Sequence, residues 1–457
     1  MPLRTKRLLT LLILAALIRG VMLWVVIQYP DRTIRRDSEG YIQVAVNLLG
    51  GHGISLRTEP PYVPSALRTP VFPMFIAFFY KLFGNSYLII AIAQVVISLI
   101  TVALTYLLGL KLLSENEAWI GALLFALSSA PAIYAVFILS ETLFTLLLIL
   151  VLLAMVLYRE RKQICWLVAA GIIAGLAILC RPVAAYFPVL AVGLIWLAEP
   201  GKLRKSLTGI FAFLLVCTLV VGPWVWRNMR QLGIPVISTI SSYNLLFYNA
   251  VSLKADQEGV SQAHTRADLQ TQVNAELAKR DGLDNETIQT RLFDKWGWQI
   301  ILAHPLRYAV IHLENDLNNF LPDVTDFLEL MGVTQGAKGT LSVLNQQGIV
   351  AAIGHYFEGR IWLIGLTLPW IVLLGVIYLA GIVGVFVLLR RKDWFGLSLL
   401  LLPVLYYMLL PGAPSNPRFR VPVMPYLCLL GGIGCIRLTG WLQKKRTQVI
   451  KANSVYN

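Results

Sequence analysis

Two acids and two arginines lie close together near the start of the chain, where residues 35–39 read RRDSE. A carboxylate just outside a membrane helix, such as Asp37, can take the proton of a hydroxyl group as that hydroxyl attacks. The adjacent Arg36 would keep the acid ionised or bind a phosphate. Asp37 or Ser38 also suits the N-cap of a helix over 39–49, which would give the same residues a structural role. These residues alone leave both interpretations open.

Other charged residues lie beside or inside apolar runs. Arg68 precedes the apolar run 71–84, where it would hold a lipid phosphate or extend its charge to the membrane surface. Glu141 interrupts a long apolar stretch, and a carboxylate at such a depth is costly enough to indicate a function, although Glu also suits the first turn of a helix. Further cations and an amide follow in or beside the links between apolar runs, at Arg181, Arg227, Asn228, Arg418 and Arg420. A group of such cations beside one or two carboxylates is suited to bind an anionic lipid head group. Each cation taken alone could equally anchor its segment at the membrane interface.

The composition places most of the chain in lipid. Of its 457 residues, 57% are hydrophobic and 14% are charged, and the mean hydropathy is +0.69. Soluble domains carry about 25% charged residues, so most of this surface must face lipid. The net charge of +15 comes largely from short basic clusters between apolar runs, which membrane topology explains without a nucleic-acid partner.

The basic clusters mark the cytoplasmic side, and all of them must share one face of the membrane. An arrangement with about ten transmembrane helices meets this condition, since each span needs about 20 apolar residues. The expected spans are 8–28, 86–113, 118–138, 142–158, 164–180, 183–198, 206–223, 362–390, 394–411 and 422–442. Both termini are then cytoplasmic, and the run 71–84, which is too short to cross, lies at the outer interface.

The same topology leaves three segments outside the cytoplasm, residues 29–85, 224–361 and 412–421. The second is polar and predicts amphipathic helices near 264–280 and 287–303. All five histidines lie in these outer segments, so function is expected there. The five cysteines all lie in apolar runs, which argues against a disulfide framework or a thiolate metal site.

An ordered set of motifs gives the chain a family resemblance. The pieces are RDSEGYIQVAVNLLGGHG, RTPVFPMFIAFFYKLFGNS, LSETLF, CRPVAAYFP, GPWVWRNMRQLG with NLLFYNA, and RFRVPVMPYL. In this order they resemble the bacterial branch of the superfamily of protein O-mannosyltransferases and aminoarabinose transferases, which has the GT-C fold. The resemblance covers residues 37–250 well and the last two helices moderately, and it treats 251–360 as a variable extracytoplasmic insert.

The resemblance implies a sugar donor linked to polyprenyl phosphate and inversion at the anomeric carbon. It gives the catalytic-base role to Asp37. Family members often carry two adjacent acids in this loop, whereas here Ser38 separates Asp37 from Glu39. The sequence therefore does not decide which of the two acids is the base. By analogy, Arg68, Glu141, Arg181 and Arg418 line the cavity. With their neighbours, the expected donor site comprises Arg36, Arg68, Arg181, Arg418 and Arg420, and the expected cavity Tyr41, Glu141, Arg227 and Asn228.

The expected protein is an all-α polytopic membrane enzyme. An N-terminal membrane module over 1–250 carries the catalytic first outer loop, 251–361 form an extracytoplasmic loop region, and 362–457 hold the C-terminal helices and a cytoplasmic tail. In the bacterial inner membrane, surrounded by lipid, it would move a hexosyl or pentosyl group from the polyprenyl-phosphate donor to an extracytoplasmic glycan, lipid or protein. The sequence requires no cofactor. The outer carboxylates could bind a divalent cation, and the sequence does not decide whether they do.

Two other functions remain as alternatives. A polysaccharide polymerase or ligase would use a lipid-diphosphate donor, with His304, Arg307 and His312 as candidates for its chemistry. A transporter or flippase would favour intramembrane charged pairs, broken helices and an internal repeat, whereas the sequence has an asymmetric outer mass and no such repeat. No Walker loop, zinc signature, nucleophile elbow or Rossmann fingerprint occurs, so an activated donor has to arrive through the membrane.

Overall fold

The computed structural model describes residues 2–333, 340–357, 359–360 and 362–453, and within these ranges it contains helices, turns and links but no strand. Six of the described helical segments are long and apolar enough to cross a membrane, so the chain is a multi-pass membrane protein. They are α1 (Leu3–Gln28), α4 (Tyr87–Leu112), α7 (Glu141–Arg161), α10 (Leu203–Leu232), α19 (Leu363–Arg391), and η5 (Pro417–Val423) with the first part of α21 (Met424–Asn453).

Shorter helices complete the bundle. Four are apolar: α3 (Val71–Phe83), α8 (Cys165–Cys180), α9 (Phe187–Ala198) with the preceding η2 (Pro182–Tyr186), and α20 (Trp394–Leu409). Two others, α5 (Glu115–Leu127) and α6 (Ser129–Ile133), follow α4. The predicted all-α membrane fold is confirmed, and each of the ten expected spans coincides with one or more of these helices.

One expected span, 118–138, is not a single helix. The helix α5 ends at Leu127, the short α6 follows, and a turn leads to the start of α7. Pro131 has no N–H for the carbonyl of Leu127, so α5 cannot continue unbroken through this point. A carbonyl at the end of α5, that of Ala126, accepts a hydrogen bond from the buried Arg19 of α1 at 3.1 Å. The chain therefore breaks after Leu127, well before residue 138, where the predicted span was to end.

Another expected span, 206–223, is longer than predicted. The helix α10 runs through Pro223 and ends at Leu232, where Gly233 adopts a left-handed conformation with φ 70°. A proline removes one backbone hydrogen bond, which a long and otherwise regular helix tolerates. Arg227 and Asn228 therefore lie on a helix and not in a loop.

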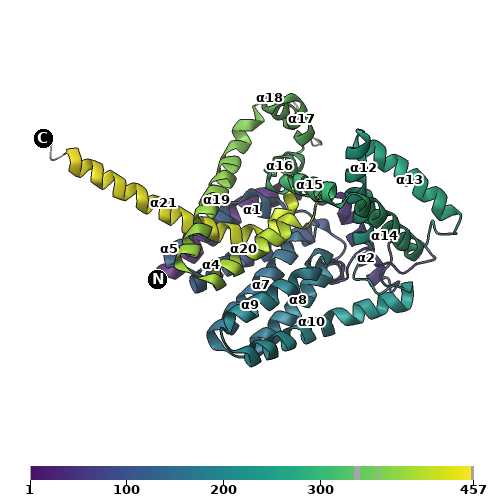
Figure 1. The fold of residues 1–457 in the computed structure, drawn as a ribbon, viewed down its shortest axis with the longest axis horizontal. Coiled ribbons are helices and arrows are strands. Elements are labelled where there is room, and N and C mark those ends of the chain that lie inside the picture. The colour runs from purple at the N-terminus through teal and green to yellow at the C-terminus, as the bar shows by residue number, and fades with distance from the viewer. Residues whose placement is uncertain (1, 334–339, 358, 361, 454–457) are drawn as a thin grey trace.

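The remaining described helices lie at one end of the bundle, called here the loop face (Figure 1). The first outer segment supplies η1 (Pro30–Thr33) and α2 (Arg36–Leu49). The second supplies α11 (Ile240–Asn244), η3 (Leu245–Ala250), α12 (Val251–Glu258), α13 (Gln262–Ala278), α14 (Glu286–Ala303), α15 (Pro305–Asp316), η4 (Leu317–Phe320), α16 (Val324–Met331), α17 (Thr340–Gln347) and α18 (Ile349–Tyr356). The helices α13 and α14 confirm the two amphipathic helices predicted in this region.

Close helix packing holds the bundle together beneath the loop face. Buried apolar side chains of α4, α5, α7, α8, α19 and α21 form one continuous core. The helices α19 and α21 approach so closely that a Cβ at Gly384 or Gly434 would overlap the opposing backbone. A smaller core under α12–α14 is built around Phe247, Val273 and Phe293, and these helices form a lobe beside the bundle (Figure 1). The bundle thus gives a fixed base to the links of the loop face.

Candidate active site

Asp37 lies in the first turn of α2, on the loop face. A different residue closes the start of this helix, since the backbone N–H of Arg35 donates to Oγ of Ser38 at 2.9 Å. The Asp37 carboxylate instead accepts one hydrogen bond at each oxygen, at 3.0 Å from Nη2 of Arg68 to Oδ1 and at 2.6 Å from Nη1 of Arg418 to Oδ2. The helix begins at Arg36 with Arg35 as its N-cap, so neither Asp37 nor Ser38 is the N-cap that was predicted for a helix over 39–49.

The two arginines control the ionisation of Asp37. Burial by itself would raise the pKa of Asp37, but the charges of Arg418 and Arg68 and their hydrogen bonds outweigh it and hold the pKa well below its usual range. The carboxylate is therefore ionised at physiological pH. While both arginines stay in place it is a weak base, because a group with a very low pKa binds a proton poorly.

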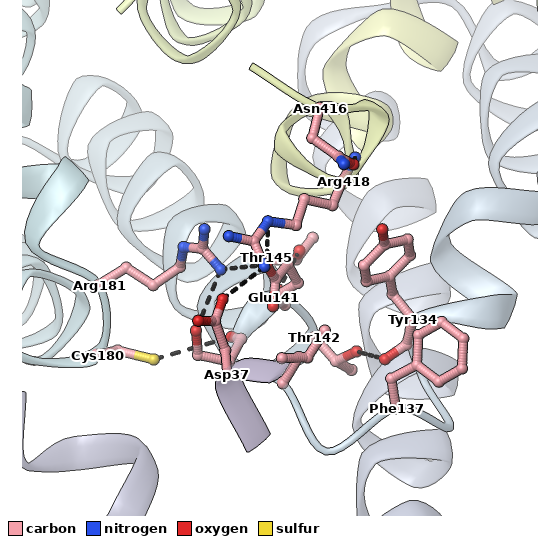
Figure 2. Close-up of polar contacts among 12 residues, drawn as sticks. Asp37, Tyr134, Phe137, Glu141, Thr142, Thr145, Cys180, Arg181, Asn416 and Arg418 are labelled. Carbon is pink, nitrogen blue, oxygen red and sulfur yellow. Dashed lines mark hydrogen bonds and ion pairs between the residues drawn. The ribbon is translucent and has the colours of Figure 1, made fainter. Parts of the chain in front are cut away.

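A second carboxylate, Glu141, lies beside the first at the start of α7. Its side chain is 1% exposed and forms an ion pair with Arg181, the residue between α8 and η2. Nε of Arg418 lies 3.9 Å from Oε1 of Glu141, so one guanidinium group lies between the two carboxylates. Nη1 of Arg181 also donates to Oγ of Ser140 at 3.1 Å. Figure 2 shows the guanidinium groups of Arg181 and Arg418 converging on Asp37 and Glu141 from opposite sides.

Arg68 reaches Asp37 from the link before α3. Its guanidinium carbon lies 4.7 Å from the ring centre of Tyr41, where the face of the ring attracts the cation. Gly40 provides the room for this approach, since a Cβ at that position would lie 2.9 Å from Nε of Arg68. The Tyr41 hydroxyl lies 3.5 Å from Oγ of Ser140, which joins α2 to the start of α7.

These side chains form one group, called here the Asp37 cluster and consisting of Asp37, Arg68, Glu141, Arg181 and Arg418. Its members come from five separate segments of the chain, and together they carry one excess positive charge. Asp37 and Arg418 remain 28% and 29% exposed, so a ligand can reach them. A partly open site with an excess of guanidinium groups suits an anion such as a phosphate, and the ionised acid beside it can receive a proton.

The chain is similar to known proteins in part of its sequence and in its fold. Residues 67–226 match the family described as dolichyl-phosphate-mannose-protein mannosyltransferase, and the curated protein sequences give no match. Among solved structures, the oligosaccharyltransferase AglB from Archaeoglobus fulgidus, in complex with an inhibitory peptide and a dolichol-phosphate, is 12% identical with a TM-score of 0.52. That match covers 98% of this chain and 52% of AglB. The chain has the GT-C fold.

The GT-C chain spans about half the length of AglB. A second AglB structure, in complex with Zn and sulfate, is 11% identical with a TM-score of 0.51, covering 98% of this chain and 51% of that one. ArnT from Cupriavidus metallidurans, bound to undecaprenyl phosphate, is 14% identical with a TM-score of 0.44, covering 98% of this chain and 64% of ArnT. The resemblance predicted from the motifs is confirmed by the fold and by the family match over 67–226, which includes Arg68, Glu141 and Arg181.

Several predicted site residues of this GT-C chain lie outside the Asp37 cluster. Arg36 and Glu39 are exposed on α2, and neither forms an ion pair within the part of the chain that the structure describes. Arg420 is fully buried, donates to the carboxylate of Asp323 at 3.1 Å and donates to the backbone carbonyl of Asn319 at 2.9 Å. The structure thus brings Arg418 to Asp37 but turns Arg420 toward a different group.

Arg227 and Asn228 also have other partners. Arg227 donates to the backbone carbonyls of Ser65 at 2.8 Å and Ile54 at 3.2 Å. Asn228 is buried and donates from Nδ2 to the carbonyl of Val236 at 2.7 Å. They tie the end of α10 to the first outer segment and to the link that follows α10. Both side chains were predicted to line the cavity, and their contacts instead give them a supporting role, since they hold neighbouring segments together.

A second set of contacts, which the sequence did not predict, lies next to the Asp37 cluster. The hydroxyl of Tyr134 donates to Oδ2 of Asp326 at 2.8 Å, and Nη1 of Arg35 lies 2.5 Å from Oε2 of Glu329. Both contacts fasten α16 to the turn before α7 and to the start of α2. Burial raises the pKa of Asp326 to about 6, with the nearby charges and the Tyr134 hydrogen bond as smaller influences. Tyr134 lies in an apolar run and no spacing links it to α16, so no pattern in the sequence indicates this pairing.

The acids of the site do not form a set suited to a divalent cation. No group of three or more His, Cys, Asp or Glu within the described ranges could hold a metal ion. Asp37 and Glu141, on which such a cation would have to rely, both face arginine side chains. A divalent cation prefers several oxygen ligands and is repelled by guanidinium groups, so these residues as arranged do not fit one.

Proposed function

We propose that this protein transfers a sugar from a polyprenyl-phosphate-linked donor to a hydroxyl group of an acceptor outside the cytoplasm. The observation that carries the proposal is the position of Asp37 between Arg68 and Arg418 on the loop face. The family matched by residues 67–226, which takes its name from a dolichyl-phosphate-linked mannose donor, supports this choice. AglB, which shares the fold, was solved with a dolichol-phosphate, and this supports a lipid phosphate as the anion.

The proposed reaction is a single displacement. The acceptor oxygen forms a bond to the anomeric carbon as the bond from that carbon to the phosphate oxygen breaks, which inverts the anomeric centre. Asp37 receives the proton of the acceptor hydroxyl, and the polyprenyl phosphate leaves with the electron pair of the broken bond. Arg68, Arg181 and Arg418 would stabilise the charge that grows on the leaving phosphate.

The contacts of Asp37 suggest an order of events. Its pKa is held low by Arg418 and Arg68, so it accepts a proton poorly in the structure described. A donor phosphate would attract the same two guanidinium groups and draw part of their charge away from Asp37. The pKa of Asp37 would then rise toward a value that suits a general base. We therefore infer that the donor binds before Asp37 becomes an effective base.

The proposed orientation follows the basic residues. The loop face would lie outside the cytoplasm, and the opposite end of the bundle, where Lys111, Arg159 and Arg391 lie at helix ends, would face the cytoplasm. Both termini would then be cytoplasmic in the bacterial inner membrane. A cysteine-accessibility experiment with a membrane-impermeant thiol reagent tests this orientation. Cysteines placed at positions 52 and 443 are expected to be labelled from opposite sides.

Transfer by the purified protein in nanodiscs tests the function. Radiolabelled sugars on polyprenyl monophosphate and on polyprenyl diphosphate are offered separately, with a membrane extract as the source of acceptors and Asp37→Asn as the blank. Label that moves into an acceptor only from the monophosphate donor and only with the wild type supports the proposal. Transfer from the diphosphate donor alone contradicts it and favours a polysaccharide polymerase or ligase.

A further inference from the structure

The last link on the loop face, residues 410–416 between α20 and η5, has no regular secondary structure. It leads directly to Arg418, the residue that bridges Asp37 and Glu141. An irregular link of this kind does not fix its own geometry, because few backbone hydrogen bonds act within it. Side chains from other elements must therefore determine where the guanidinium group of Arg418 lies.

One buried carboxylate, Asp316 at the end of α15, bonds this link at two points. Its Oδ1 accepts hydrogen bonds from the backbone N–H of Gly412 at 2.8 Å and from Oγ of Ser415 at 2.7 Å. Asp316 is 1% exposed, so these bonds are shielded from water. Buried acids are costly, and this one has no arginine or lysine in an ion pair with it within the described residues. Apart from the ring of His312 beside Oδ2 and the amide of Asn319, the polar partners of Asp316 belong to the link.

A second buried polar residue, Asn319 of η4, continues the same pattern along the link. Its Nδ2 donates to Oγ of Ser415 at 3.1 Å, and its Oδ1 accepts from the backbone N–H of Asn416 at 3.0 Å. Oδ1 of Asn416 in turn accepts from the backbone N–H of Arg418 at 3.1 Å. A continuous series of hydrogen bonds thus runs from the end of α15 to the backbone of Arg418.

The fit around Gly412 is close. Its φ of 65° lies in the left-handed region, and a Cβ at this position would overlap the ring of His312. Nε2 of His312 lies 3.0 Å from the carbonyl oxygen of Leu409 and 3.3 Å from Oδ2 of Asp316. The ring therefore occupies the space between α15 and the start of the link, and it leaves the link little freedom to shift.

We propose that Asp316, supported by Asn319, is a positioning residue that fixes the last link so that Arg418 reaches Asp37. Residues 251–360, which the family resemblance treats as a variable insert, would then supply part of the site's geometry. The effect on ligand binding rests on the proposed function, because it takes polyprenyl phosphate as the ligand of the Asp37 cluster. The effect on the link itself does not depend on that function.

Binding of undecaprenyl phosphate to the full-length protein in nanodiscs provides the first test. Asp316→Ala removes the acceptor of two hydrogen bonds and is expected to weaken binding about tenfold, because the freed link no longer holds Arg418 beside Asp37. Asp316→Asn keeps an oxygen at the same position and is expected to stay within about twofold of the wild type. Asp256→Ala is the matched control, since Asp256 also accepts two hydrogen bonds, from Arg307, on the exposed surface of α12.

A double-mutant cycle separates positioning from a general loss of structure. If Asp316 acts through Arg418, Asp316→Ala has almost no further effect on binding in an Arg418→Gln background. An undiminished loss in that background would overturn the proposal, as would wild-type affinity in a folded Asp316→Ala protein. Should Asp316→Ala fail to fold, Ser415→Ala removes one of the two bonds and is expected to weaken binding about threefold.

Hydrogen–deuterium exchange of residues 410–418 keeps the inference testable if the wild type binds no polyprenyl phosphate. That result would count against the proposed function and not against the positioning role. Exchange of this segment is then expected to be faster in Asp316→Ala than in the wild type and unchanged in Asp316→Asn and Asp256→Ala. Equal exchange in Asp316→Ala and the wild type would overturn the positioning role.

Discussion

Arg418 donates a hydrogen bond of 2.6 Å to Asp37 although 381 residues separate the two in sequence. The contact joins α2, near the start of the chain, to η5, near its end. Both side chains remain partly exposed, so a ligand phosphate can compete with the carboxylate of Asp37 for the guanidinium group of Arg418. This competition connects anion binding to the basicity of Asp37 and underlies the first two predictions.

Replacing Asp37 with Asn is expected to abolish transfer while donor binding persists. The amide cannot accept a proton from the acceptor hydroxyl, and loss of general-base catalysis lowers rates by about 10²–10⁴-fold. Binding of the donor should be unchanged or stronger, because Asn no longer neutralises Arg68 and Arg418. The measurement is the rate of sugar transfer beside the affinity for undecaprenyl phosphate. Glu39→Gln is the control, since Glu39 is exposed and should keep most activity; near-normal turnover of Asp37→Asn would remove Asp37 from the mechanism.

Arg418→Lys is expected to weaken donor binding although it preserves the positive charge. The Arg418 guanidinium contacts Asp37 through Nη1 and faces Glu141 through Nε, and a single ammonium group cannot reproduce both arrangements. We expect an affinity for undecaprenyl phosphate about tenfold lower, equivalent to about 1.4 kcal/mol. Arg36→Lys, at an exposed position without an ion pair to Asp37, should change the affinity by less than about twofold. Equal effects of the two substitutions would show that only net charge matters at this site.

The sequence predicted the bundle well because membrane spans obey simple rules. Length, apolarity and the distribution of basic residues place each helix, and the same rules put Asp37, Glu141, Arg181 and Arg418 on one face. The two errors in the bundle have local causes. One is the break after Leu127, and the other is the tolerance of α10 for Pro223.

The sequence could not show which of two neighbouring arginines contacts Asp37. Arg418 and Arg420 are two residues apart in one short helix, and only the partners decide their roles. Arg420 pairs with Asp323, which lies in the region that the resemblance left without a role. Contacts between such distant segments have no periodicity or spacing to reveal them, and Asp316 remained unnoticed for the same reason.

Gly40→Ala is expected to impair the site without damaging the fold. A Cβ at Gly40 would lie 2.9 Å from Nε of Arg68, and this flexible side chain would have to move away from Asp37. Affinity for undecaprenyl phosphate should fall several-fold, by about 1 kcal/mol.

Gly20→Ala is the matched control, because Gly20 also lies within a helix and a Cβ there meets no atom within 4 Å. Thermal unfolding should show both variants to be as stable as the wild type or slightly more so, since Ala favours helices; a wild-type affinity for Gly40→Ala would mean that Arg68 does not need its present position.

The attachment of α16 is expected to weaken as the pH rises. The pKa of Asp326 is about 6 in the folded protein, because burial raises it, against about 3.9 in an unfolded chain. The folded state therefore retains a proton that the unfolded state has already released, so this contribution to stability is complete below about pH 4 and is lost as the pH rises through about 6. Asp326→Asn should remove this pH dependence and be more stable than the wild type at pH 8, by on the order of 2 kcal/mol. The test compares thermal unfolding of the two proteins from pH 4.5 to pH 8.

Asp256→Asn is the control, because a hydrogen bond from Arg307 lowers the pKa of Asp256 and its replacement should have no stabilising effect at pH 8. Parallel curves for the wild type and Asp326→Asn would show that Asp326 does not retain its proton when α16 is docked.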